Sequence, residues 1–224
     1  MSFPLNLNIT FASSAVMKQV ARKESWEHTA EACFTNYLHF LLLQFLLKNE
    51  QVFTVKAEHK EALESMRRIL ADIQTRQIKA NGEDGFFSAV PEKTETTFTF
   101  SSFFSQLVGS NVTSELEKHA ISEVMKANVK WNGSKQSGLS YDVNQVKQFV
   151  ENYFEWNQGL FTDGSDLDNI CVGLTAILEY LSAEILELSS HHTKDEAMTL
   201  EALKKGISGD SALMALPYTH IFFP

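Results

Sequence analysis

The chain has 224 residues, of which 44% are hydrophobic and 21% charged, and its formal net charge is −9. This composition is typical of a soluble globular protein with one large core or two smaller domains, and it excludes a disordered chain. The two cysteines, Cys33 and Cys171, lie in apolar helical contexts, and we expect both to be buried reduced thiols.

The charge is distributed unevenly along the chain. Residues 1–135 contain fifteen Lys and Arg against fifteen Asp and Glu, whereas residues 136–224 contain four lysines against thirteen acids. The second part therefore carries the whole net charge, and its surface offers DNA no long-range attraction. No basic segment precedes an apolar run, so we expect no signal peptide, and the apolar segment 37–47 is too short to span a bilayer.

The N-terminal residues 1–24 have few basic side chains and leave two interpretations open. Leu5, Leu7, Ile9 and Phe11 alternate with polar or small residues, which favours a short strand, and the alternative is a disordered end. A helical pattern then runs from RKESW (22–26) to about Leu47, with Ser25 as its predicted N-cap, and VFTV (52–55) is a candidate loop strand.

The middle of the chain predicts further helices. Residues 61–78 place apolar side chains on one helical face and end at NGEDG (81–85), where glycine permits a helix exit. A long loop follows, then a helix start near Ser101 or Ser102. Another helix opens at Thr113 or Ser114, where Glu117 completes a capping box. NGSKQSG (132–138) is a short linker, so we expect the two parts of the chain to lie side by side.

The second part repeats a short–long–short pattern. We expect helices at 142–155, 168–190 and 199–207, with Thr199 capping the last one. The long helix has Leu174, Ile177, Leu178, Leu181, Ile185 and Leu188 at steps of three and four residues, which predicts one buried face. The apolar tail ALMALPYTHIFFP (212–224) is expected to pack against something.

Several stretches carry a resemblance to the histones. LEYLSAEILEL (178–188) resembles the long central helix of histone 2A, and SGLSYDVNQVKQFV (137–150) resembles the entry and first helix of the same histone. SELEKHAISEVMKANVKWNGSK (114–135) is similar to the C-terminal helix of histone 2B, and the helix at 61–78 is similar to its central helix. A 2B-like part before a 2A-like part is the order found in the fused histone doublets of some giant viruses.

This resemblance, which covers roughly residues 24–216, implies an all-α fold of two histone folds that form an intramolecular histone-type dimer. The implied domains are an N-terminal extension (1–24), a 2B-like fold with its C-terminal helix (25–133) and a 2A-like fold with an apolar tail (134–224). The implied function is structural: the peripheral dimer of a viral nucleosome-like particle, with a histone 3/4-type partner bound through a four-helix contact and the tail. The implied location is the virion, the viral factory or the host nucleus.

The resemblance also assigns candidate site residues. The acids that match the acidic patch of the peripheral histone dimer are Glu115, Glu123, Glu179, Glu184, Glu187 and Asp210. They would dock an arginine or lysine anchor from a partner protein. The alternative is an ordinary solvated helix face. Ser211 and Ala212 stand where two further acids are expected, so the patch is thinner than in the family.

The DNA-binding residues depart from the family. Where histone 2A places arginines on its first helix, this chain has Gln145, Gln148 and Glu151, and its second loop has Asp195 and Glu196 in the region of a groove-inserting arginine. The remaining candidates for DNA backbone contacts are Lys18, Arg22, Lys23, Arg67, Lys147, Lys204 and Lys205. Wrapping of DNA is therefore expected to be weak and sensitive to salt.

Two other classes of function have little support in the sequence. His191, His192 and Asp195 lack the spacing of a metal site, and no nucleophile–base set or phosphate-binding loop occurs, so we expect no metal, no cofactor and no enzymatic activity. The rival hypothesis is an acidic histone mimic or scaffold that binds histones or chaperones without binding DNA.

Overall fold

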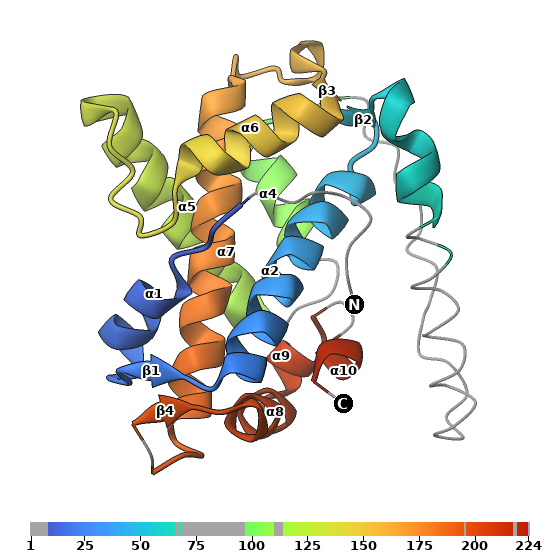
Figure 1. The fold of residues 1–224 in the computed structure, drawn as a ribbon. Coiled ribbons are helices and arrows are strands. Elements are labelled where there is room, and N and C mark those ends of the chain that lie inside the picture. The colour runs from blue at the N-terminus through green and yellow to red at the C-terminus, as the bar shows by residue number, and fades with distance from the viewer. Residues whose placement is uncertain are drawn as a thin grey trace.

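A computed structural model describes residues 9–65, 68, 97–109, 114–194, 196–216 and 219–223 (Figure 1). The larger described helices are α1 (Ser13–Val20), α2 (His28–Lys48), α4 (Phe100–Gly109), α5 (Ser114–Ser134), α6 (Val143–Tyr153), α7 (Leu167–Ser190) and α8 (Leu200–Ser208). The shorter elements are β1 (Ser25–Trp26), β2 (Phe53–Val55), η1 (Ala57–His59), β3 (Phe154–Trp156), η2 (Gln158–Leu160), β4 (Ala197–Met198), α9 (Ser211–Met214) and α10 (Thr219–Phe222).

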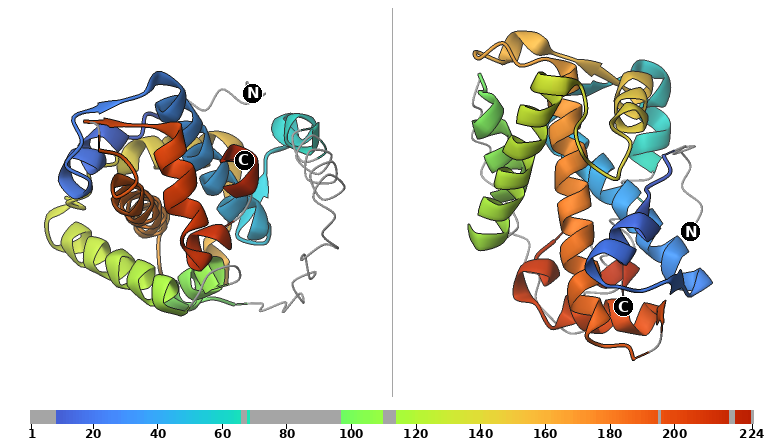
Figure 2. Two further views of the ribbon diagram at one scale, coloured as in Figure 1. Left: turned by 90° about the horizontal axis from the view of Figure 1, so that it is seen from below. Right: turned by 90° about the vertical axis from the view of Figure 1, so that its left-hand side faces the viewer.

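Helix α7 lies at the centre of the fold, and α1, α2, α5, α6 and α8 all pack against it (Figure 2). The Asp166 carboxylate starts the helix by accepting a hydrogen bond from the Asn169 N–H at 2.8 Å. Ile177 and Leu181 are buried, with at most 1% of their surface exposed. The predicted long helix and its buried face are therefore confirmed. The predicted helices on either side correspond to α6 and α8, and Thr199 caps α8 through the Ala202 N–H.

Helix α2 is buried on nearly every side, because α7, α8, α10 and β2 surround it. Among the described residues, α2 and α7 are the helices long and apolar enough to cross a membrane. However, 67% and 72% of their most apolar windows are buried inside the structure. The core helices of a soluble protein have this property, because burial against protein and burial in lipid select similar compositions.

The first part of the chain differs from its prediction at two places. Residues 13–20, predicted within an extension, form α1, whose Val16 and Met17 are buried against the core. Ser25 does not cap a helix but starts β1, because the backbone of β1 pairs with β4, and α2 begins only at His28. Residues 60–65 and 68 are helical, as the pattern at 61–78 predicts, and the rest of that segment lies outside the described residues.

Three strand contacts connect distant parts of the chain. β1 pairs with β4 in parallel, with Ser25 opposite Ala197 and Trp26 opposite Met198. A single parallel bridge joins Phe98 to Phe161. β2 pairs with β3 in antiparallel orientation, which confirms the predicted loop strand at 52–55. Each contact joins a residue before Ser114 to one after Asp142, so the two parts of the chain share one core.

The linker lies a few residues later in the chain than its sequence indicates. Helix α5 continues through Asn132 and Gly133 to Ser134, so the connection to α6 spans only residues 135–142. Gly138 has a φ of +73°, and a Cβ at this position would lie 2.9 Å from the Lys130 Nζ. The turn therefore favours glycine for its backbone angle, because the Lys130 side chain is exposed and can move away from an added Cβ.

The apolar tail folds back onto the chain itself. The Phe222 ring lies 5.3 Å from the Tyr37 ring and 5.4 Å from the Phe40 ring, and Phe223 makes an edge contact with Tyr37. The Cys33 thiol, also on α2, donates to the Phe222 carbonyl oxygen at 2.8 Å. The prediction that the tail packs is confirmed for its described residues. Its packing surface is α2, so the rings expected to dock on a partner are already buried.

Candidate functional site

Glu179, the first predicted patch residue on α7, has an internal role. Its Oε2 accepts hydrogen bonds from the Ser140 N–H at 2.6 Å and the Tyr141 N–H at 2.8 Å. Burial raises the pKa of its carboxyl group, the two hydrogen bonds partly oppose this, and Glu123 adds to the rise. Glu179 therefore holds the segment before α6 against α7, and its carboxylate has less capacity left for a partner.

The next residue, Tyr180, is the centre of the acidic surface. Burial is the main cause that raises the pKa of its hydroxyl group. A hydrogen bond with Glu184 and the negative charges of Glu184, Glu123 and Asp210 raise this pKa further. The His119 ring makes an edge contact with the Tyr180 ring at 6.4 Å between centroids. The negative charges of carboxylates on α5, on α7 and at the start of α9 thus all act on the Tyr180 hydroxyl. We call Tyr180, Glu123, Glu184 and Asp210 the Tyr180 cluster.

Part of this acidic surface is compensated within the chain. Lys118 Nζ lies 3.0 Å from the Glu115 carboxylate, and Lys126 Nζ lies 2.7 Å from that of Glu123. Both pairs join neighbouring turns of α5 and are exposed, so they reduce the net charge without rigidly fixing the carboxylates. Asp210 caps α9 by accepting from the Ala212 and Leu213 N–H groups. Glu187 is exposed one turn beyond the half-buried Glu184.

The sequence located these acids but not the tyrosine between them. The spacing of Tyr180 and Glu184, four residues apart on one helix, is a local signal for their contact. The approach of Glu123 and Asp210 depends on the packing of α5 and α9 beside α7, and no sequence spacing shows it.

The predicted DNA-contacting cations are largely engaged with neighbouring groups. Lys147 lies 2.6 Å from Asp168 and 3.8 Å from Glu151, and hydrogen bonding to Asp168 raises its pKa. Lys18 pairs with Glu24 at 3.5 Å, and Lys205 pairs with Glu201 at 3.4 Å.

The remaining candidates have various surroundings. The Lys23 ammonium donates to the Thr193 carbonyl oxygen at 3.1 Å, and Arg22 follows α1 with a φ of +53°. Lys204, on α8, lowers the pKa of the nearby Cys33 thiol, which burial raises more strongly. Arg67 lies outside the described residues. Because α6 and α8 lie towards opposite ends of α7, the lysine of α6 lies apart from the two lysines of α8 (Figure 1).

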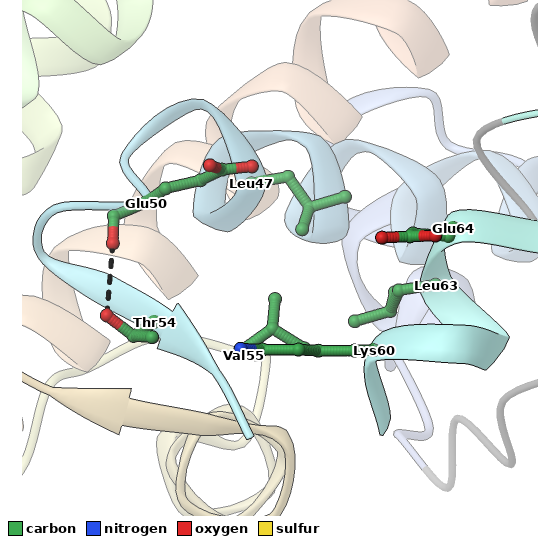
Figure 3. A pocket seen from close by; sticks show the side chains of 7 residues that line it. All are labelled: Leu47, Glu50, Thr54, Val55, Lys60, Leu63 and Glu64. Carbon is green, nitrogen blue, oxygen red and sulfur yellow. Dashed lines mark hydrogen bonds between the residues drawn. The ribbon is translucent and has the colours of Figure 1, made fainter. Parts of the chain in front are cut away.

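A cavity of about 320 Å³ opens at the C-terminal end of α2, and sequence analysis does not predict it. Figure 3 shows Leu47, Val55 and Leu63 pointing toward one another across it. Its lining is completed by Glu50, Thr54, Lys60 and Glu64. The described residues of this lining include no Ser, Cys or His that could serve as a nucleophile with a base. Elsewhere among the described residues no three His, Cys, Asp or Glu side chains gather as a metal site, and Asp195 lies outside them.

Comparison with known proteins indicates the family of part of the chain. No protein-family model matches it. The Z variant of histone 2A from Lodderomyces elongisporus is 34% identical over 95 residues, which is 41% of this chain and 65% of that histone. The same variant from Saccharomyces cerevisiae is 33% identical over 88 residues, 38% of this chain and 61% of that histone. The chain thus spans somewhat less than two thirds of these relatives. Together with the helical fold around α7, these similarities show that the chain contains a region like histone 2A.

Proposed function

We propose that the chain is a structural chromatin protein in which two histone folds, a 2B-like and a 2A-like one, pair within one polypeptide. The observation that carries this proposal is the pair of parallel contacts, β1 with β4 and Phe98 with Phe161. Each contact joins the segment before one central helix to the segment before the third helix of the other unit. Two short–long–short units joined in this way are arranged head to tail.

The structure favours a different 2B-like unit from the one the sequence predicts. In this assignment α1, α2 and α4 are its short, long and short helices, and α5 is its C-terminal helix. The 2A-like unit consists of α6, α7 and α8. The segment 49–97 is then an insertion between α2 and α4, so residues 61–78 do not form the central helix. The 2B-like unit begins near Ser13, and α1 takes the place of its first helix.

The order of the two units supports a more specific proposal. A 2B-like unit followed by a 2A-like unit is the order of viral histone doublets, so we place the protein in a virion, a viral factory or a host nucleus. Its partner would be a histone 3/4-type protein. Because the tail rings are packed on α2, that contact would use the described outer surfaces of α4 and α5 or the cavity at the end of α2.

The Tyr180 cluster is the proposed docking site for a basic partner. Glu184, half-buried beside the Tyr180 ring, and the Asp210 carboxylate present acceptor oxygens that suit an arginine guanidinium.

An arginine-anchored peptide should therefore bind the chain, and the double variant E184Q/D210N should weaken this binding about tenfold, as loss of charge-assisted hydrogen bonds does. Asparagine at 210 still caps a helix, so the fold should remain intact. The matched control is E155Q/E201Q, which removes two exposed acids from other elements; an equal loss in the control would contradict a specific site.

The assembly experiment uses the full chain, DNA of about 150 base pairs and a histone 3–4 tetramer across a salt series. A nuclease-protected particle that contains all three components supports the structural role. Failure to bind the tetramer at any salt concentration would contradict it.

The rival, an acidic histone mimic, is favoured by one set of observations. Three of the candidate lysines, Lys147, Lys18 and Lys205, form ion pairs with Asp168, Glu24 and Glu201, respectively. In the same experiment, this rival predicts a stable complex with the tetramer from which DNA is excluded. The two functions thus both require binding to the histone tetramer, and they differ in whether the complex also binds DNA.

A further inference from the structure

The first residues that the structure describes, 9–12, connect the two parts of the chain, and we call them the N-terminal strap. Figure 1 shows them leading from α1 towards α6. The Ile9 carbonyl oxygen lies 2.7 Å from His39 Nε2 on α2. The Thr10 N–H donates to Gln145 Oε1 on α6, also at 2.7 Å. The strap therefore joins α2, in the first part of the chain, to α6, in the second.

His39 holds the strap in two ways. A carbonyl oxygen only accepts hydrogen bonds, so His39 Nε2 carries a proton and donates it to the Ile9 carbonyl oxygen. The Phe11 ring lies between two other rings, 5.1 Å from that of His39 and 5.0 Å from that of Tyr141. Ile9, Phe11 and His39 are all buried. One titratable side chain thus supplies both a hydrogen bond and a packing surface for the strap.

The surroundings of His39 do not compensate a positive charge. Its neighbours on α2, Leu38 and Phe40, are buried and apolar. At the entry to α6 the Tyr141 hydroxyl donates to Ser182 Oγ, and the Tyr141 N–H donates to Glu179. Burial lowers the pKa of His39 and outweighs the opposing hydrogen bond to Ile9. Among the described groups, no charged side chain contributes to this shift.

We propose that the N-terminal strap is an acid-sensitive clasp: neutral His39 holds it across α2 and α6, and protonation of His39 releases it. In the open form the imidazole is hydrated and returns to the ordinary histidine pKa of 6.5, so the open form binds the proton more tightly. Closure is therefore favoured above pH 6.5 and weakens as pH falls from 6.5 through the lower pKa of the closed form. The clasp needs neither DNA nor a histone partner, so it goes beyond the proposed function.

The variant His39→Gln tests the release. Glutamine can still donate a hydrogen bond to the Ile9 carbonyl oxygen, but it does not titrate. The matched control is His59→Gln, because the His59 ring, on η1, contacts Tyr153 and not the strap. In the parent chain and both full-length variants, the Thr10 amide and the Phe11 ring resonances are followed by NMR from about pH 8 to about pH 5.

The parent chain and H59Q should release the strap in one step with a midpoint below pH 6.5, and the His39 ring should titrate at the same midpoint. Between the pKa values of the open and closed forms, the opening constant should rise by about tenfold per pH unit. H39Q should stay closed over the whole range. A strap that does not move with pH in the parent chain, or that opens equally in H39Q, would overturn the proposal.

The amide of Ile177, in the buried part of α7, distinguishes local release from unfolding of the chain. Its resonance should stay in place while the strap opens. A simultaneous change at Ile177 and Thr10 would also overturn the proposal, because unfolding of the whole chain would then explain the release.

A second pair of variants covers the case in which H39Q does not fold. Gln145→Ala removes the contact that holds Thr10 and does not titrate, and Gln148→Ala is the matched control on the exposed face of the same helix. Loss of one hydrogen bond should raise the opening constant by up to about tenfold, so Q145A should release the strap up to about one pH unit higher than the parent chain. Q148A should release it at the pH of the parent chain. Equal midpoints in Q145A and Q148A would overturn the coupling between the strap and His39.

Discussion

The two central helices, α2 and α7, have similar lengths and burial but different surroundings. α7 is buried on every side over residues 170–178, and its later turns carry the half-buried Glu179 and Glu184 and the exposed Glu187. α2 has twelve buried residues and almost no polar face, because the tail helix α10 covers the side that would otherwise be exposed. The tail thus makes α2 an interior element over residues 37–47, whereas the later turns of α7 present a surface.

This difference shows why periodicity is informative for only one of the two helices. An amphipathic pattern requires a solvent-facing side, which α7 has over 179–188 and α2 lacks over 37–47. The tail supplies the missing cover for α2, so residues 222 and 223 complete the core around this helix.

The largest expected effect tests whether both helices belong to one core. Leu38 on α2 and Leu178 on α7 are fully buried. Leu38→Ala and Leu178→Ala should each lower the free energy of unfolding by about 3 kcal/mol, because each leaves a cavity. Urea unfolding followed by circular dichroism and by tryptophan fluorescence should give one coincident transition in each variant. Two separate transitions, with only one affected by each substitution, would show that the halves fold independently.

The next largest effect concerns the C-terminal tail that covers α2. Removal of residues 217–224 should destabilise the chain by about 2 kcal/mol, since the buried Phe223 and the half-buried Phe222 lose their contacts. The Tyr37 hydroxyl, which is buried without a hydrogen-bond partner among the described residues, becomes hydrated and offsets part of this loss.

The two thiols report on the same truncation. Cys33 bonds to the Phe222 carbonyl oxygen and should react with a thiol reagent much faster once the tail is removed. Cys171 is fully buried, and burial raises its pKa, so it serves as the internal control. Unchanged reactivity of Cys33 would mean that the tail does not cover α2 in solution.

The smallest effects concern two carboxylates with opposite pKa shifts. The pKa of Glu179 is raised in the folded chain. Its favourable contribution to the free energy of unfolding is therefore present below the unfolded pKa of about 4.5, and it is lost as pH rises through the folded pKa. Asp163 is affected by burial, which raises its pKa, but its hydrogen bonds from Phe100 and Ser165 outweigh this and lower it. Its contribution is therefore present above 3.8 and is lost as pH falls through the folded pKa.

Unfolding of E179Q and D163N, compared with the parent chain at several pH values, measures these contributions. The free energy of unfolding of E179Q should increase relative to that of the parent chain as pH rises above 4.5. D163N should be less stable than the parent chain at neutral pH, and this difference should disappear as pH falls below 3.8. The same sign of pH dependence for both variants would contradict the contacts described for one of them.

Short-range signals in the sequence determine the 2A-like part of this fold. Asp142, Asp166 and Thr199 cap helices through N–H groups two or three residues away, and the periodicity of α7 covers four turns. Such signals lie within one element, so the bounds of α6, α7 and α8 follow closely from the residues themselves.

Tertiary structure alone decides the rest. α1 is too short for a clear pattern and is stabilised by packing on α7, and β1 exists because β4, more than 170 residues later, supplies its hydrogen bonds. The Tyr180 cluster and the contacts of Glu27 and Asp163 likewise join residues far apart in the chain. Composition and spacing determine which segments become helices. Contacts that form only when the two parts of the chain pack together decide where each helix packs. They also decide which backbone N–H groups the Glu27 and Asp163 carboxylates bind.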